Sequence, residues 1–348
     1  MVSWTSSPTK STLANTPFIP RKFLEGKHLQ TVYNVLFPPD NTLEEDFYCE
    51  GILLPTKDAT GDHLWLEHNP PISQIKKNSI PWNGYYLVLI HGMEGSSESH
   101  YMVSVGREAL LRGYGVIRVN LRNCGKGLNL ARTPYNAGQS EDLEQVLDYI
   151  RKKLTLNIFV SGFSLSANLV LKYFGEKRRN KASAFTATSP PLDLKRSCDF
   201  IDSKAGLFYR THFLNTMKEK VQSGIYQISE SMIERVMRAR TFFDFDEFFT
   251  APLSGYKNVL EYYHTCSSIY YLSNIKIPGL IIHANDDPVV PSHVWREINW
   301  NAFPAIETVL TEQGGHVGFI SDPSPDNPEG RWLPKIIMDF FDKKLKVY

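Results

Sequence analysis

The chain has 348 residues, and its 38 Lys and Arg residues balance 37 Asp and Glu residues, which gives a formal net charge of +1. This balance argues against nucleic acid as the main partner. The length allows one large α/β domain or two smaller ones, and the four widely separated cysteines form no CxxC pair, so we expect reduced thiols rather than a disulfide framework.

Residues 1–20 are rich in Ser, Thr and Pro, and we expect them to form a flexible N-terminal segment. The stretch from Met1 to Lys10 is polar and lacks the apolar core of a signal peptide. Because no apolar run approaches the length of a membrane span, we expect a cytoplasmic protein, with peripheral membrane contact left open. The amino-acid sequence gives no indication of the oligomeric state.

From residue 21 to residue 348 the pattern favours a single domain. Two short apolar runs, 51–54 and 63–66, predict an early hairpin, and the proline-rich stretch 69–83 predicts a loop. Strand-like and helix-like runs then alternate, which is typical of a mostly parallel sheet with helices on both faces. The expected strands are 85–90, 115–120, 157–161, 184–188, 279–282 and 307–310, and the expected helices are 102–112, 139–153, 167–174 and 332–345.

The alternation stops between about residues 193 and 275, where helical segments follow one another without a clear strand. This stretch is rich in Phe, Tyr and Met. Such an insertion can simply pack its apolar face on the main domain, or its side chains can line a pocket for an acyl chain. Both can be true, and we expect a helical cap insertion over about 193–275.

The most informative stretch is Gly162-Phe163-Ser164-Leu165-Ser166, which lies between a strand-like run and a helix-like run. A Ser held between small residues on such a turn is the nucleophile elbow of the α/β-hydrolase fold. The usual motif ends in Gly, whereas this chain has Ser166, which is still small. The other interpretation is that Ser164 only caps the helix.

A Ser hydroxyl needs a base to take its proton, and α/β-hydrolases place Ser, then Asp or Glu, then His along the chain. Here an apolar run ends at Asp286 and Asp287, and His316 follows two glycines after the last expected strand. We expect His316 to be the base and prefer Asp287 as its acid, because Asp287 stands four residues before Pro291, as in many hydrolase acid loops. Asp286 stays the alternative.

Acyl transfer also requires donors for the negatively charged oxygen that forms in the reaction. We expect the backbone N–H groups of Leu165, next to the nucleophile, and of Met93 to form this oxyanion hole. Met93 belongs to the loop His91–Gly95, in which His91 is expected to shape the backbone rather than act as a base. The chemistry needs no cofactor, and the sequence shows no metal-ligand motif.

Together these motifs resemble the YheT-like branch of the α/β-hydrolase superfamily over roughly Phe23 to Leu345. That family is similar to carboxylesterases and acylglycerol lipases acting on short- to medium-chain esters, and some members pass the acyl group to an alcohol. The resemblance implies that Ser164, Asp287 and His316 fall on the triad of the family. The matching segments are His28–Thr31, His91–Gly95, Arg122–Gly125, Tyr135–Gly138, Phe245–Pro252, Asp286–Pro288 and Gly314–Phe319.

The sequence therefore predicts a serine carboxylic-ester hydrolase without a cofactor or metal, whose substrate is a small-molecule acyl ester. Ser164 would form the acyl-enzyme, and water or an alcohol would release the acyl group. A protein of the same fold that binds an acyl ligand or a protein partner without catalysis is the alternative. Dehalogenases and epoxide hydrolases use a carboxylate nucleophile, and the Ser at the elbow disfavours them.

Overall fold

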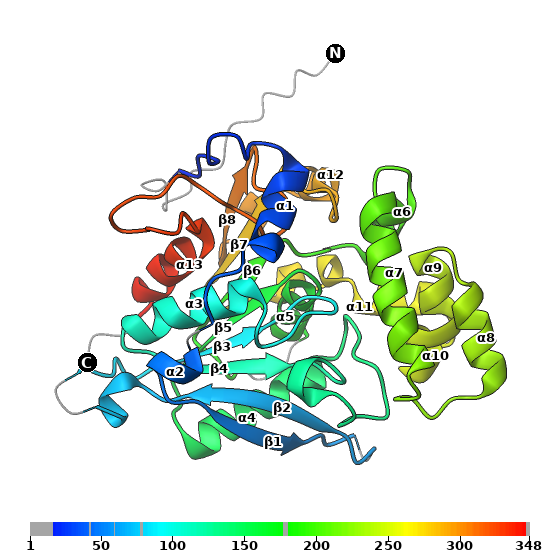
Figure 1. Ribbon diagram of the computed structural model, residues 1–348, viewed down its shortest axis with the longest axis horizontal. Coiled ribbons are helices and arrows are strands. Elements are labelled where there is room, and N and C mark those ends of the chain that lie inside the picture. The colour runs from blue at the N-terminus through cyan, green and yellow to red at the C-terminus, as the bar shows by residue number, and fades with distance from the viewer. Residues whose placement is uncertain (1–16, 42, 59, 77–78, 177–179, 346–348) are drawn as a thin grey trace.

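The computed structural model describes residues 17–41, 43–58, 60–76, 79–176 and 180–345, so most of the expected N-terminal segment lies outside the described residues. An eight-stranded sheet runs through the centre in the order β1-β2-β4-β3-β5-β6-β7-β8 (Figure 1). The strands are β1 (Glu50–Pro55), β2 (His63–Asn69), β3 (Tyr86–Ile90), β4 (Gly115–Asn120), β5 (Ile158–Phe163), β6 (Ala184–Thr188), β7 (Gly279–Ala284) and β8 (Ile306–Thr311).

The sheet is mostly parallel, as the alternating pattern predicts. β1 and β2 form the expected antiparallel hairpin, and β2 is also antiparallel to β4. All the other neighbouring pairs, from β4 to β8, are parallel. The carboxyl ends of the parallel strands therefore share one edge, where ligands bind in folds of this class.

Helices cover both faces of the sheet, which buries β3 on both sides. Leu87 and Leu89 pack in the layer of α3 (His100–Leu111) and α13 (Trp332–Asp342). Val88 and Ile90 pack in the layer of the helices α4 (Ser140–Lys153) and α5 (Leu165–Gly175). Successive side chains of a strand point to opposite faces. This double burial explains why the strand reads as one uninterrupted apolar run.

The N-terminal arm carries α1 (Lys27–Leu36), which turns its polar side inward. The buried side chain of Gln30 donates to the carbonyl of Ile320 at 3.0 Å and accepts from its N–H at 2.7 Å. Asn34 donates to the carbonyl of Gly318 at 3.0 Å. These bonds hold the segment after β8 against α1. The shorter elements of the main body are α2 (Leu43–Asp46), η1 (Ile72–Gln74), η2 (Gly125–Gly127), α12 (Ser292–Glu297) and η6 (Trp300–Ala302).

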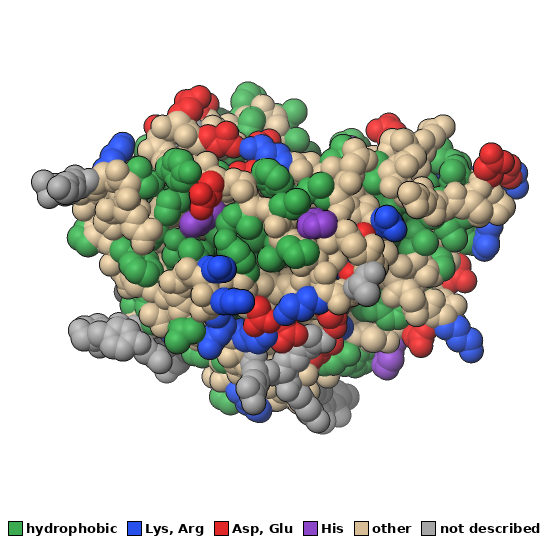
Figure 2. All heavy atoms as spheres, turned by 90° about the horizontal axis from the view of Figure 1, so that it is seen from below, with side chains coloured by type: hydrophobic (Ala, Val, Ile, Leu, Met, Phe, Trp, Pro, Cys, Tyr) green, Lys and Arg blue, Asp and Glu red, His purple; other side chains and the backbone are tan. Residues whose placement is uncertain are grey.

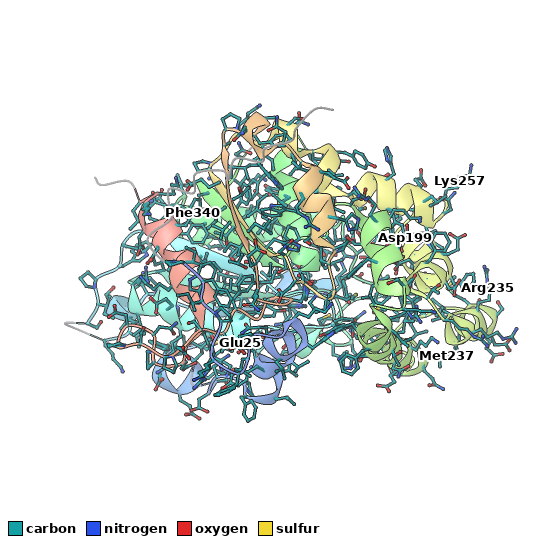
Figure 3. The ribbon with its side chains drawn as sticks, turned by 90° about the horizontal axis from the view of Figure 1, so that it is seen from above. Glu25, Asp199, Arg235, Met237, Lys257 and Phe340 are labelled. Carbon is teal, nitrogen blue, oxygen red and sulfur yellow. The ribbon has the colours of Figure 1, made fainter. Side chains whose placement is uncertain are left out.

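Between β6 and β7 the chain forms helices joined by short loops and no strand, as expected for residues 193–275, and these helices gather at one side of the molecule in Figure 1. Figure 3 shows the same separation from above, with Asp199, Arg235, Met237 and Lys257 on this side and Phe340 on the other. The segments are α6 (Leu194–Asp202), α7 (Leu207–Gln222), α8 (Glu230–Arg238), α9 (Phe242–Phe245), η3 (Asp246–Thr250), α10 (Ala251–Leu253), α11 (Val259–Cys266), η4 (Ser268–Tyr270) and η5 (Leu272–Asn274).

These helices have an apolar core of their own, distinct from the two layers on the sheet. Val221, Phe245 and Tyr262 are among its buried members, and Met93 and Leu165 reach it from the edge of the sheet. The segment therefore packs directly over the loops that carry the expected oxyanion donors.

The surface is chemically mixed. On the face in Figure 2, Lys and Arg side chains lie among Asp and Glu side chains rather than forming an area of one charge. Among the described residues, no helix has both the length and the apolar character needed to span a bilayer.

Candidate active site

Ser164 occupies the sharp turn between β5 and α5. Its backbone lies at φ 53° and ψ −120°, a conformation that L-residues rarely adopt and that costs free energy. Its N–H donates to the carbonyl of Thr188 at 2.8 Å, which fixes the turn to the next strand. A Cβ on Gly162 would lie 2.4 Å from the carbonyl oxygen of Ser166, so this position requires glycine. The structure thus places Ser164 on a tight strand-to-helix turn, where the sequence predicts it.

Ser166, which stands where the usual motif has Gly, has a specific structural role. Its side chain is buried, and its hydroxyl donates to the carbonyl of His91 at 2.5 Å. The bond ties α5 to the loop after β3. A glycine could not make this bond, so in this chain Ser166 connects the elbow to the opposite wall of the site.

The structure brings the three predicted side chains together from three separate loops. The Nε2 atom of His316 lies 2.8 Å from the Oγ atom of Ser164, and its Nδ1 atom lies 2.8 Å from the Oδ2 atom of Asp287. The other carboxylate oxygen of Asp287 accepts the N–H groups of Val289 and Val290 at 2.8 and 2.9 Å. These bonds fix the orientation of the buried carboxylate.

Asp286 and Asp287 face different partners. Asp286 accepts the N–H of Gly315 at 2.9 Å, so it braces the loop that carries His316. Burial is the main cause that raises the pKa of Asp286, and the neighbouring carboxylate of Asp287 raises it further. Of the two acids, Asp287 is the one that contacts the imidazole ring.

The His316 loop is also held by Thr31 of α1. The Oγ1 atom of Thr31 accepts the N–H of His316 at 2.9 Å and donates to the carbonyl of Lys27 at 2.7 Å. Gly315 lies so close to α1 that a Cβ there would be 2.6 Å from this hydroxyl. The sequence motif His28–Thr31 therefore acts as a support for the histidine, a role that sequence reasoning did not assign.

Removing this support should slow turnover without unfolding the protein. Thr31→Val is expected to lower kcat for an ester substrate about tenfold, because the histidine loop loses an acceptor that orients it. KM should change little, since Thr31 does not line the pocket. Thr31→Ser keeps the hydroxyl and should restore kcat. Equal kcat values in wild type and Thr31→Val would contradict this role.

The loop after β3 lies directly against Ser164. A Cβ on Gly92 would be 2.8 Å from the Cβ atom of Ser164, so only glycine allows this approach. Within the described part of the chain, neither the N–H of Met93 nor that of Leu165 donates to a protein acceptor. Both donors are thus available beside Ser164, as an oxyanion hole requires.

His91 does not face the reacting groups. Its ring is fully buried, and its Nε2 atom accepts the N–H of Leu121 at 3.0 Å. Its Nδ1 atom donates to the carbonyl of Gly92 at 2.6 Å. Burial lowers the pKa of His91 to about 4, so it stays neutral and fixes the shape of this loop.

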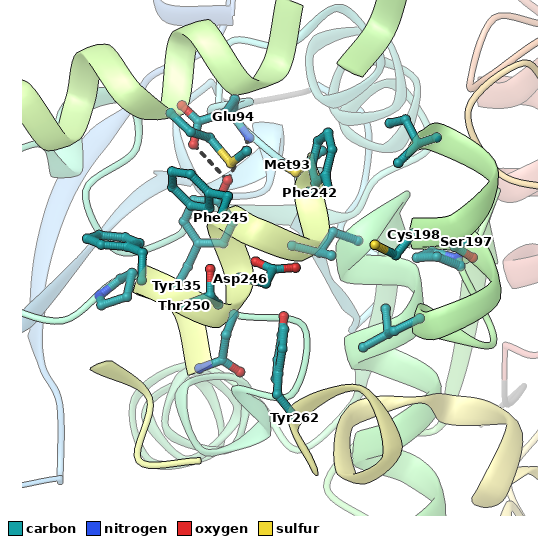
Figure 4. Close-up of a pocket in the computed structure, with 18 of the residues that line it drawn as sticks. Met93, Glu94, Tyr135, Ser197, Cys198, Phe242, Phe245, Asp246, Thr250 and Tyr262 are labelled. Atoms are coloured by element: carbon teal, nitrogen blue, oxygen red, sulfur yellow. Dashed lines mark hydrogen bonds between the residues drawn. The ribbon is translucent and has the colours of Figure 1, made fainter. Parts of the chain in front are cut away.

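Ser164 lines a pocket that extends among the helices of residues 193–275. Figure 4 shows part of its lining, including Met93, Phe245 and Tyr262. Its empty volume is about 930 Å³, and this value includes the part of the pocket that is open to solvent. Its walls are mostly apolar and come from both parts of the chain. They include Met93, Leu165, Ile201, Met217, Phe242, Phe245, Phe249, Tyr262, Val289 and Val290.

Two sets of polar side chains on these walls were not predicted from the sequence. Glu94 and Lys220 form an ion pair at 2.9 Å, and the hydroxyl of Tyr135 donates to Glu94 at 2.7 Å. On another wall, the carboxylate of Asp246 accepts from the hydroxyl of Tyr263 at 2.7 Å. An isolated Glu, Lys or Asp carries no signal in a single sequence, because most such residues lie at the surface.

One cluster in the described residues has side chains of the types that bind metals, namely Glu44, Cys49 and Glu67. Lys126 already lies 2.6 Å from Glu44 and 3.1 Å from Glu67 and supplies the positive charge there. Burial, assisted by Glu67, raises the pKa of the Cys49 thiol to about 12, which disfavours a metal-binding thiolate. We therefore assign no metal to this cluster.

Residues 85–323 match the family model of the α/β hydrolase fold. The chain belongs to this family. Within it the chain is YheT-like: it is 28% identical to YheT of Escherichia coli (strain K12) over 328 residues, which cover 92% of each protein.

Two further comparisons agree with this assignment to the α/β hydrolase fold. A monoacylglycerol lipase of Saccharomyces cerevisiae is 29% identical over 250 residues, which cover 68% of this chain and 55% of that protein. Among solved structures, the esterase Pf2001 of Pyrococcus furiosus superposes with a TM-score of 0.57 at 18% identity, over 89% of this chain and 100% of that chain. The structural likeness supports the fold.

Proposed function

We propose that the protein is a serine carboxylic-ester hydrolase. The observation that carries the proposal is the continuous chain of hydrogen bonds from Ser164 through His316 to Asp287, with 2.8 Å at each step. A hydroxyl, an imidazole and a buried carboxylate in this order form the arrangement that activates serine in acyl transfer. A relative named as a monoacylglycerol lipase supports the same reaction class.

In the proposed reaction, His316 takes the proton of Ser164 as its Oγ atom attacks the ester carbonyl. The N–H groups of Met93 and Leu165 bind the negatively charged oxygen of the tetrahedral intermediate. His316 then gives the proton to the leaving alcohol, and an acyl-enzyme is left on Ser164. Asp287 holds the imidazole in the required tautomer and stabilises its positive charge.

Water activated by His316 releases the acyl group as a carboxylic acid. Because a second alcohol could occupy the same position, the acyl-enzyme can also give a new ester. The apolar pocket suits a short- to medium-chain acyl group, and we propose that residues 193–275 act as a cap that keeps this chain away from water. No step requires a cofactor.

The experiment is to measure release of p-nitrophenol from p-nitrophenyl esters of two to sixteen carbons by the purified protein. We expect saturable hydrolysis with the highest kcat/KM among the short and medium chains. A decline at long chains would reflect the limited apolar volume beneath the cap. A protein that binds these esters and releases no p-nitrophenol above the spontaneous rate would instead be a non-catalytic member of the family.

A further inference from the structure

The pocket under the cap contains a carboxylate that the proposed chemistry does not use. Asp246 lies among the rings of Phe242, Phe245 and Tyr262, and Figure 4 shows its side chain directed into the pocket. It starts η3, a five-residue π-helical segment that ends at Thr250. Short π-helical segments are rare and occur often at functional sites. The local backbone therefore presents both Asp246 and Thr250 to the same space.

Asp246 has no cationic partner in the described part of the chain. Hydroxyl donors contact it, from Tyr263 at 2.7 Å and from Thr250, and the charged group that acts on it is Asp202, another acid. The nearby titratable side chains of Tyr262, Tyr263 and Cys198 have raised pKa values because of burial and stay neutral. Asp246 is only partly exposed. A carboxylate in such a place without a counter-ion is unusual, because desolvation disfavours the charged form.

The other charged groups on the pocket wall compensate each other. Lys220 pairs with Glu94 at 2.9 Å, and Tyr135 donates to the same carboxylate. Lys220 is thus occupied and does not neutralise Asp246. A carboxylate offers about four lone-pair positions, and the two hydroxyls use only part of this capacity. Asp246 is therefore the group on this wall that is best able to accept a further hydrogen bond from a bound molecule.

We propose that Asp246, with Thr250 beside it, is a specificity subsite that binds a hydrogen-bond donor carried by the ester substrate, either an alcohol hydroxyl or an ammonium group. This proposal rests on the proposed function, because it concerns the pocket that opens at Ser164. The donor would fill the acceptor capacity of Asp246 that Tyr263 and Thr250 leave unused, and the surrounding aromatic rings would pack on the carbon chain of the substrate. Ammonium would also gain from the ring faces.

The test compares esters that differ only in the terminal group. One series contains p-nitrophenyl hexanoate, 6-hydroxyhexanoate and 6-aminohexanoate, which place the donor on the acyl side. A second series contains butyl, 4-hydroxybutyl and 4-aminobutyl butyrate, which place it on the alcohol side. We expect kcat/KM to be about 10- to 100-fold higher for a donor-bearing ester in one series, as a hydrogen bond to a charged group gives.

The assignment to Asp246 is tested by Asp246→Asn, which keeps the size of the side chain and removes its charge. The ratio of kcat/KM between donor-bearing and plain esters should fall at least tenfold in this variant. Asp199→Asn removes an exposed carboxylate from α6 of the same segment and should leave the ratio unchanged. An equal or greater kcat/KM for the plain esters in wild type, or an unchanged ratio in Asp246→Asn, would overturn the proposal.

A stability measurement shows whether Asp246→Asn still folds and whether the charged carboxylate of Asp246 destabilises the folded protein. Burial raises the pKa of Asp246 from 3.8 to about 6. An acid whose pKa is higher in the folded state makes the fold less stable as the pH rises through this interval. The Tm of Asp246→Asn relative to wild type should therefore increase between pH 4 and pH 7. A constant difference in Tm would contradict an uncompensated carboxylate.

The two proposals can fail separately. Hydrolysis of the plain esters that depends on Ser164, without a preference for a donor, would remove the Asp246 subsite and leave the ester hydrolase. No turnover of any ester by the wild-type protein would remove both.

Discussion

Replacing Ser164 with alanine should lower kcat for p-nitrophenyl butyrate by at least about 10⁴-fold, the largest effect expected for any single substitution in this chain. The Oγ atom of Ser164 is the group placed to form the acyl-enzyme, and among the described residues it is the hydroxyl that bonds to the Nε2 atom of His316, at 2.8 Å. The residual rate would come from the oxyanion donors acting on water. The measurement is steady-state p-nitrophenol release by the purified variant.

The fold of Ser164→Ala should be retained, because alanine removes one oxygen from a position whose backbone bonds remain. The N–H of residue 164 still donates to Thr188. The backbone strain at φ 53° also remains, so the Tm should stay close to that of wild type. A Ser164→Ala variant that folds and hydrolyses the ester at more than a tenth of the wild-type rate would exclude Ser164 as the nucleophile.

Replacing Asp287 with asparagine should lower kcat by about 10³- to 10⁴-fold. The carboxylate holds the Nδ1 proton of His316 at 2.8 Å, so that the Nε2 atom is free to accept the proton of Ser164. An amide in the same place can present its NH₂ group to the ring and favour the wrong tautomer. It also lacks the negative charge that stabilises the imidazolium. The measurement is kcat against pH, and the loss should be largest near neutrality.

Asp286→Asn is the matched control, with the same change one residue away. The amide oxygen of asparagine can still accept the N–H of Gly315, the bond that Asp286 makes at 2.9 Å. We therefore expect less than a tenfold change in kcat. A large loss in Asp286→Asn together with a small loss in Asp287→Asn would exchange the roles of the two acids.

The sequence predicted the architecture well because the signals were periodic and local. The uninterrupted apolar run before His91 indicated a strand buried on both faces, and β3 is such a strand. The small residues around Ser164 predicted a tight turn, and Gly162 has no room for a side chain. The choice of Asp287 over Asp286 came from its spacing to Pro291, and the bond to His316 agrees with that choice.

The rest of the site depends on contacts between residues far apart in the chain, which no local pattern encodes. Thr31 reaches His316 over 285 positions. Lys220 reaches Glu94 over 126 positions. In the sequence, Asp246 is an acid within a run of phenylalanines. Its place in the pocket depends on how η3 packs on α11. Such partners become visible only when the fold brings the helices together over the sheet edge.

The role of Ser164 as the nucleophile is tested most directly by locating the covalent adduct formed with a fluorophosphonate, which reacts with an activated serine. The protein is labelled, digested and analysed by tandem mass spectrometry. We expect one phosphonyl group on Ser164, with loss of ester hydrolysis in proportion to labelling and no labelling of the folded Ser164→Ala variant. Ester hydrolysis that persists in fully treated protein while Ser164 stays unmodified would contradict it.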